Sequence, residues 1–202
     1  MEKQDENILK VRGYRSIVAA AFRLYSRRFL PMLKSQWPYL LATALVTVTD
    51  NMLTLYQQYL SVPLVLLEGI LELLLWLMTA RWLTQRPLRN VVRTAWHHWF
   101  VLLWVTFVGS IFLIPLSVVL GLPQIILMLA HADAAQSTML GDADGMPSSM
   151  PYMMAVVNLL TALMLLLLRL ILVYVGYYAW GSAEAKKRER QAQLSTLNVR
   201  LS

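Results

Sequence analysis

The stretch "MLLLLRLILVYV", residues 164–175, places one arginine inside an otherwise apolar run. It belongs to a longer apolar segment, 152–180, which exceeds the roughly 20 residues that a helix needs to cross a bilayer. Three further segments reach this length: 37–57, 61–80 and 99–121, the last with an extension to 128. We therefore predict an all-α integral membrane protein built as a bundle of four spanning helices.

The composition is typical of a membrane protein. Of the 202 residues, 58% are hydrophobic and only 14% are charged, whereas a soluble domain has about 25% charged residues. A soluble helical bundle would scatter charge over every helix, so we set this alternative aside. The chain has no cysteine, which excludes disulfides, thiolate metal sites and cysteine nucleophiles. The net charge of +7 fits loops that face an anionic leaflet, and we expect no nucleic-acid partner.

The basic residues predict how the chain is threaded. Every Lys and Arg except Arg169 lies in the N-terminal segment, the loop between the second and third spans, or the C-terminal tail. The loops near 57–61 and 131–151 contain none. Because cytoplasmic loops accumulate Lys and Arg, we expect both termini in the cytoplasm of a bacterial-type inner membrane. The predicted regions are a cytoplasmic segment (1–36), a four-span domain (37–180, its last two spans 99–128 and 152–180) and a basic tail (181–202).

Two basic amphipathic segments accompany the spans. The first, "RSIVAAAFRLYSRRFLPML" (15–33), has an apolar and a basic face, and Pro31 should kink or end it. The second is "PLRNVVRTAWHHWF" (87–100). Such helices lie in the membrane interface, although the first also fits an ordinary helix packed on the bundle. We assign to anionic lipid headgroups the arginines of the charged faces: Arg15, Arg23, Arg27, Arg89 and Arg93.

The stretch "SIVAAAFRLYSRRFLPML" (16–33), followed by a span dotted with polar residues, resembles the membrane domain attached to some bacterial glycerophosphoryl diester phosphodiesterases. Related stand-alone membrane proteins of four to six spans and unknown function look similar. The resemblance covers the N-terminal third by motif and the rest by layout. It implies a membrane domain and brings no catalytic residue, because the phosphodiesterase barrel of that family has no counterpart in this sequence.

Three ionisable residues lie deep in the predicted spans. At the rise of an α-helix, Arg169 sits ~16 Å from the inner interface, Glu72 ~13 Å and Glu68 ~20 Å. Ionisable residues inside a membrane usually pair with one another, so we predict a Glu72–Arg169 pair with Glu68 as second acceptor. The first span adds a polar stripe that must face protein or water, formed by Thr43, Thr47, Asp50, Asn51, Thr54 and Gln58.

Two interpretations of this network remain open at this point. In the structural one, Glu68, Glu72 and Arg169 lock the second and fourth spans together, and the chain is a non-enzymatic scaffold or regulatory subunit. In the functional one, two carboxylates one turn apart share one arginine and move a proton, ion or small solute. The expected partners are the lipid bilayer with its anionic lipids, and a membrane protein or a second copy of the chain.

Other candidate motifs are weaker. The Met-rich stretch 128–154 with His131 offers soft ligands for Cu(I), but its spacing does not repeat, and methionine is a common filler of apolar contacts. "DADG" (142–145) begins like a calcium loop and lacks the closing Glu, which indicates a turn. An enzyme acting on lipids would need polar residues at an interface, where only His97 and His98 stand. We predict no metal, no cofactor and no enzymatic activity.

Overall fold

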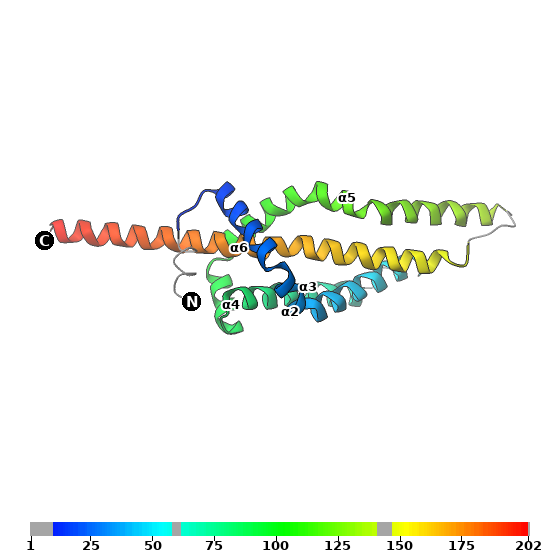
Figure 1. Cartoon of the computed structure of the whole chain (residues 1–202), viewed down its shortest axis with the longest axis horizontal. Helices are drawn as coiled ribbons and strands as arrows, with labels where there is room; N and C mark the ends of the chain where they lie inside the picture. The colour runs from blue at the N-terminus through cyan, green and yellow to red at the C-terminus, as the bar shows by residue number, and fades with distance from the viewer. Residues whose placement is uncertain (1–9, 58–61, 141–146, 202) are drawn as a thin grey trace. The chain divides into compact units, whose positions relative to one another are not determined.

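The computed structural model describes residues 10–57, 62–140 and 147–201, which form five helices and no strand (Figure 1). Two long helices open the chain, α2 (Tyr14–Gln57) and α3 (Val62–Thr84). The short α4 (Leu88–His97) precedes two further long helices, α5 (Trp99–Met139) and α6 (Met150–Leu201). The prediction of an all-helical chain is confirmed for the described residues.

Three helices are long and apolar enough to cross a membrane: α3, α5, and α6 as far as Leu194. They cover the predicted spans 61–80 (from Val62), 99–128 and 152–180, and by length and composition they are consistent with a membrane protein. The helix α2 does not reach the same apolarity. Its first half is basic, and the polar stripe that includes Thr47, Asp50 and Asn51 interrupts its second half. A bundle of four spanning helices is therefore not established by the helices alone.

The structure differs from the prediction around Pro31. We expected an interfacial helix over 15–33 that kinks or ends there, followed by a separate span over 37–57. α2 is continuous through Pro31 and Pro38, so the helix does not end at Pro31. A proline removes a single backbone donor, and the neighbouring turns of α2 keep their helical bonds. The two predicted segments are thus halves of one helix.

The predicted loop after the third span is also shorter than expected. Residues 128–139 belong to α5, which runs through Pro115 and Pro123 without interruption. The stretch "HADAAQ" (131–136) is rich in alanine, the strongest helix former, and this composition favours continuation of the helix. The "DADG" turn (142–145) lies outside the described residues. The predicted tail is likewise helical, because α6 continues to Leu201.

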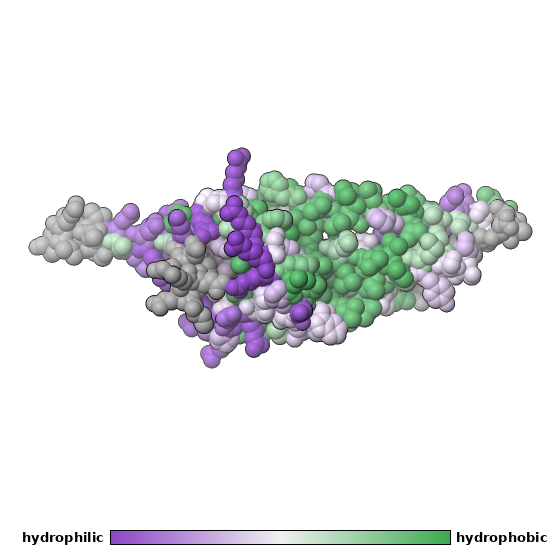
Figure 2. All heavy atoms as spheres, viewed as in Figure 1, coloured by the Kyte–Doolittle hydropathy of each residue, from purple (hydrophilic) through white to green (hydrophobic). Residues whose placement is uncertain are grey.

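The chain divides into two compact units. The first comprises residues 1–33, 77–111 and 170–202, and the second comprises 34–76 and 112–169. The two units differ in charge, since all Lys and Arg residues except Lys34 and Arg169 fall within the ranges of the first unit. On the face drawn in Figure 2, hydrophilic residues gather over the C-terminal part of α6, and hydrophobic residues cover α5.

Within the first unit, the N-terminal part of α2 packs on α6. Ile17, Ala21 and Tyr25 are buried one turn apart on one face of α2, and the ring of Tyr25 meets that of Tyr174 edge-on at 5.3 Å. This segment is therefore packed on another helix, as in one of its two interpretations. Phe22, next to Ala21 in the sequence, has an exposed side chain.

The contact between α5 and α6 in the first unit depends on a glycine. A Cβ on Gly109 would lie 2.5 Å from Leu172 Cδ2, which is closer than carbon atoms approach each other. Small residues let membrane helices come together in this way. Nearby, α4 begins after Pro87, whose backbone is extended, and it buries only Val91. Arg89 and Arg93 on the other side of α4 are exposed.

Candidate functional site

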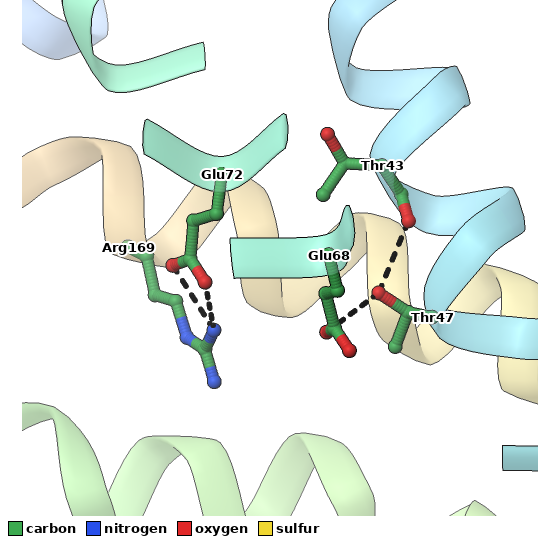
Figure 3. Close-up of polar contacts among 5 residues, drawn as sticks. All are labelled: Thr43, Thr47, Glu68, Glu72 and Arg169. Carbon is green, nitrogen blue, oxygen red and sulfur yellow. Dashed lines mark hydrogen bonds and ion pairs between the residues drawn. The ribbon is translucent and has the colours of Figure 1, made fainter. Parts of the chain in front are cut away.

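The second unit contains an ion pair between two helices that are apolar enough to span a membrane. Arg169 of α6 donates from Nη1 to both carboxylate oxygens of Glu72 on α3, at 3.1 Å each (Figure 3). The side chain of Arg169 is 47% exposed and that of Glu72 is 24% exposed. Among the described residues, the Nε and Nη2 atoms of Arg169 have no hydrogen-bond acceptor. One edge of the guanidinium is therefore open.

Arg169 lies on the packed face of α6. Asn158 and Ala162 share this face at helical spacing, and both are buried. The exposed residues of the same helix, Leu160 and Met164, lie on the opposite face. Arg169 itself is exposed, so the helices packed on this side of α6 cover its guanidinium only in part.

Glu68, one turn before Glu72 on α3, has a different partner from the predicted one. Its Oε1 accepts a hydrogen bond of 2.8 Å from the hydroxyl of Thr47 on α2 (Figure 3). In the described part of the chain, no hydrogen bond joins Glu68 to Arg169, so the prediction of Glu68 as second acceptor is wrong. The neutral hydroxyl of Thr47 faces Glu68 directly, whereas Arg169 is held by Glu72. The second oxygen of Glu68 accepts no bond from a described residue.

The remaining polar groups of this unit are linked more weakly. Asn51 Nδ2 donates to Asn158 Oδ1 at 3.5 Å, and Asn158 Nδ2 approaches Met52 Sδ at 3.8 Å. Asp50 is only 8% exposed, and its Oδ1 has no hydrogen-bond partner among the described residues. A buried carboxylate oxygen without a donor is rare in proteins, and Asp50 is the single acid of the predicted stripe.

Two polar residues of this unit were missing from the prediction. Asn158 and Thr161 are both buried on α6, and Asn158 connects α6 to α2. The pattern that identified Arg169, a polar residue inside a leucine-rich run, is equally present at Asn158. A search for uncharged polar residues in the fourth span would have found it.

In the first unit, three chain segments converge on one stretch of α6. The backbone N–H of Arg12 donates to Ser182 Oγ at 3.0 Å, and the guanidinium of Arg12 lies over the ring of Tyr178 at 5.1 Å. Arg86 lies over the ring of Trp180 at 5.3 Å. His98 Nε2 is 3.8 Å from a carboxylate oxygen of Glu184. We call this stretch, Tyr178–Glu184, the aromatic collar.

The predicted lipid-binding arginines form no ion pair with a described residue. All five are exposed: Arg15, Arg23, Arg27, Arg89 and Arg93. Two groups of this unit outside the spans have shifted pKa values. Burial, with the neighbouring His97, lowers the pKa of His98 against the opposing effect of Glu184. Burial raises the pKa of Tyr25 to about 12. Both side chains are therefore neutral at pH 7.

A metal site finds no support in the described residues, where no three His, Cys, Asp or Glu side chains come together. His97 and His98 stack edge-on with ring centres 5.0 Å apart, as side chains in contact with each other.

Comparison with known proteins identifies no relative: no family model, no curated protein and no solved structure matches the chain. The resemblance to the membrane domain of glycerophosphoryl diester phosphodiesterases therefore stays a prediction from the sequence.

Proposed function

We propose that the chain is a non-enzymatic protein of a bacterial-type inner membrane, which acts as a scaffold or regulatory subunit of a membrane complex. In this proposal α2 is the fourth spanning helix, both termini lie in the cytoplasm, and the basic faces bind anionic lipid. Each part of the proposal has its own support.

The bonds of α2 support its placement as a fourth span. Lipid offers no partner to polar side chains, so a spanning helix with a polar stripe must find its partners within the protein. Thr47 of α2 bonds to Glu68 on α3, and Asn51 bonds to Asn158 on α6. The polar side of α2 thus faces two helices that are apolar enough to span.

The first unit supports the proposed topology. The N-terminal segment, the segment between α3 and α5, and the end of α6 all meet at the aromatic collar, through Arg12, Arg86 and His98. If all three segments lie on one side of the membrane, the spans between them must be even in number. Lys and Arg concentrate on the cytoplasmic side of membrane proteins, and they concentrate in this unit.

The open edge of Arg169 carries the proposal of a subunit role. A guanidinium near the midplane with two donor nitrogens unfilled cannot be satisfied by acyl chains. A polar group on a neighbouring membrane protein would satisfy it. The most apolar stretch of α5, in which no residue is buried, leaves further helix surface for such a neighbour.

Purification in mild detergent tests this role. We expect the wild-type chain to retain a membrane protein in fixed stoichiometry and Glu72→Gln to lose it while staying folded in the membrane. Glu189→Gln, an exposed acid of the C-terminal helix, is the matched control and should retain the partner. A wild-type chain that purifies with lipid alone would contradict the proposal.

A second candidate, a small transporter or channel subunit, is favoured by one observation. The Glu72–Arg169 pair is partly exposed on the packed face of α6, where water rather than lipid would reach it. In vesicles that contain a pH-sensitive dye, this candidate predicts a proton or ion flux that Glu72→Gln abolishes and Glu189→Gln preserves. If the purified wild type carries no flux, the transporter candidate is refuted and the scaffold role stands.

A further inference from the structure

The polar groups left open on α3 and α6 complement each other. Arg169 keeps the Nε–Nη2 edge of its guanidinium free, since Glu72 occupies Nη1 alone. Glu68 keeps one carboxylate oxygen free, since Thr47 occupies the other. The N–H groups of this edge can donate charge-assisted hydrogen bonds to a carboxylate oxygen. The chain therefore presents one open donor edge and one open acceptor of opposite charge.

These two groups do not satisfy each other within the chain. The carboxylate of Glu72 holds the guanidinium, and Glu68, one turn away on α3, bonds to Thr47 instead (Figure 3). Both glutamates leave the same side of α3 (Figure 3). No side chain of α5 among the described residues bonds to either group, and the side chains of the pair stay partly exposed.

We propose that a second copy of this chain covers this site, with Arg169 of each copy bound to Glu68 of the other. A surface that carries both an open donor and an open acceptor is self-complementary, and a two-fold axis then satisfies both groups in both copies. The inference rests on the proposed membrane placement and adds the identity and chemistry of the partner.

The depths of the residues suit a dimer whose axis is perpendicular to the membrane. Such an axis keeps each residue at its own depth. By helical rise, Arg169 lies only ~4 Å from the depth of Glu68 and ~3 Å from that of Glu72, within the reach of an arginine side chain. Arg169 can therefore hold Glu72 of its own chain and Glu68 of the partner at the same time.

Charge also favours this occupant over a different partner helix. The site of one copy holds two acids and one base, so another helix would have to bring its own charged group into the bilayer, at about 2.5–3.5 kcal/mol for each such residue. A second copy adds no group beyond those that each chain already carries. The two bridges also place every acid opposite a guanidinium.

Single cysteines test the dimer, because the chain has none of its own. Val65 lies one turn before Glu68 on the same side of α3, and Ile70 lies on the opposite side; both are exposed. In lipid vesicles at high dilution, we expect Val65→Cys to form a disulfide-linked dimer with a copper–phenanthroline oxidant and Ile70→Cys to form no disulfide, because its thiols lie away from the interface. Equal cross-linking at the two positions would overturn the proposal.

Two variants then test the bridges. Glu68→Gln in the Val65→Cys background should lower the dimerisation constant about tenfold, the loss expected for two interhelical polar contacts. Arg169→Lys keeps a cation for Glu72 and lacks the second edge, so it should lower dimerisation while the thermal stability of the monomer is retained. Thr47→Val, which leaves both bridging groups in place, is the control and should dimerise like the wild type.

Unchanged dimerisation in Glu68→Gln and Arg169→Lys, or an equal loss in Thr47→Val, would overturn the bridges. The proposed scaffold role is scored separately, by the membrane protein retained in mild detergent. A monomeric chain that retains a different protein would refute the dimer alone.

Discussion

Replacing the Glu72–Arg169 pair in a double-mutant cycle gives the sharpest measure of what the pair contributes to stability. We consider Glu72→Leu, Arg169→Leu and the double variant, in a detergent that keeps the chain monomeric. Because Glu72 meets a single nitrogen, at 3.1 Å to each oxygen, the contact is one charge-assisted donor rather than a two-nitrogen fork. Interhelical polar contacts in membranes contribute about 0.6 kcal/mol on average and about 1.7 kcal/mol at most.

The charged pair should lie at the upper end of that range, so each single replacement should lower the free energy of unfolding by about 2 kcal/mol. Each single variant also leaves an unpaired ionisable group near the midplane. The double variant replaces both groups by leucine, which is often neutral or stabilising, and we expect its stability within about 0.5 kcal/mol of the wild type.

Unfolding by increasing mole fractions of SDS in mixed micelles, followed by the fluorescence of the seven tryptophans, measures all four forms. The reasoning predicts a coupling energy of about 4 kcal/mol between the two positions, because both single losses of about 2 kcal/mol are absent from the double variant. It would be refuted if the double variant were as unstable as the sum of the two single variants, because the residues would then act independently.

Three further predictions follow from the first unit. Gly109→Ala places a methyl group against Leu172 and should lower the free energy of unfolding by about 1–3 kcal/mol. The control Gly121→Ala, with nothing within 4 Å of the new methyl group, should be neutral or stabilising, and equal effects of the two variants in SDS titration would refute the close contact. The pKa of folded His98 lies below its ordinary 6.5, so its contribution to stability is complete above pH 6.5 and is lost as the pH drops through the folded pKa. His98→Gln should flatten the dependence of stability on pH between 7.5 and 5.5, and a wild-type stability that rises on acidification would contradict this. The double variant Arg89→Gln, Arg93→Gln should weaken binding of anionic lipid by about 1 kcal/mol per residue. Native mass spectrometry measures the lipid that the protein retains, and unchanged retention would show that α4 does not bind headgroups.

The helical class and three of the spans could be predicted because leucine-rich runs of sufficient length have few other stable forms in a chain of this composition. The contact between Glu72 and Arg169 could also be expected, since their depths follow from helical rise alone. The bond from Glu68 to Thr47 could not, because depth does not say which helix stands opposite. That choice depends on how α2 packs against α3, which is a tertiary property.

The errors at the helix ends have a common cause. Pro31 was expected to kink or end a helix and the residues after 128 to form a loop, yet neither α2 nor α5 ends at these places. Proline disfavours a helix locally, but neighbouring turns and alanine-rich composition can outweigh it. In α2, the polar stripe makes the helix too polar to be recognised as a span by its apolarity alone. The same stripe supplies the bonds from α2 to α3 and α6.

Determining on which side of the membrane each segment lies tests the account most directly. The helix α2 crosses the bilayer only if both termini lie on the same side. Single cysteines at Val11, Asn90, Ser149 and Gln191, all exposed, can be labelled with a membrane-impermeant maleimide in intact spheroplasts. The account predicts labelling of Ser149→Cys alone, and of the other three only after the membrane is opened. Labelling that places Val11→Cys and Gln191→Cys on opposite sides would mean three spans and would contradict it.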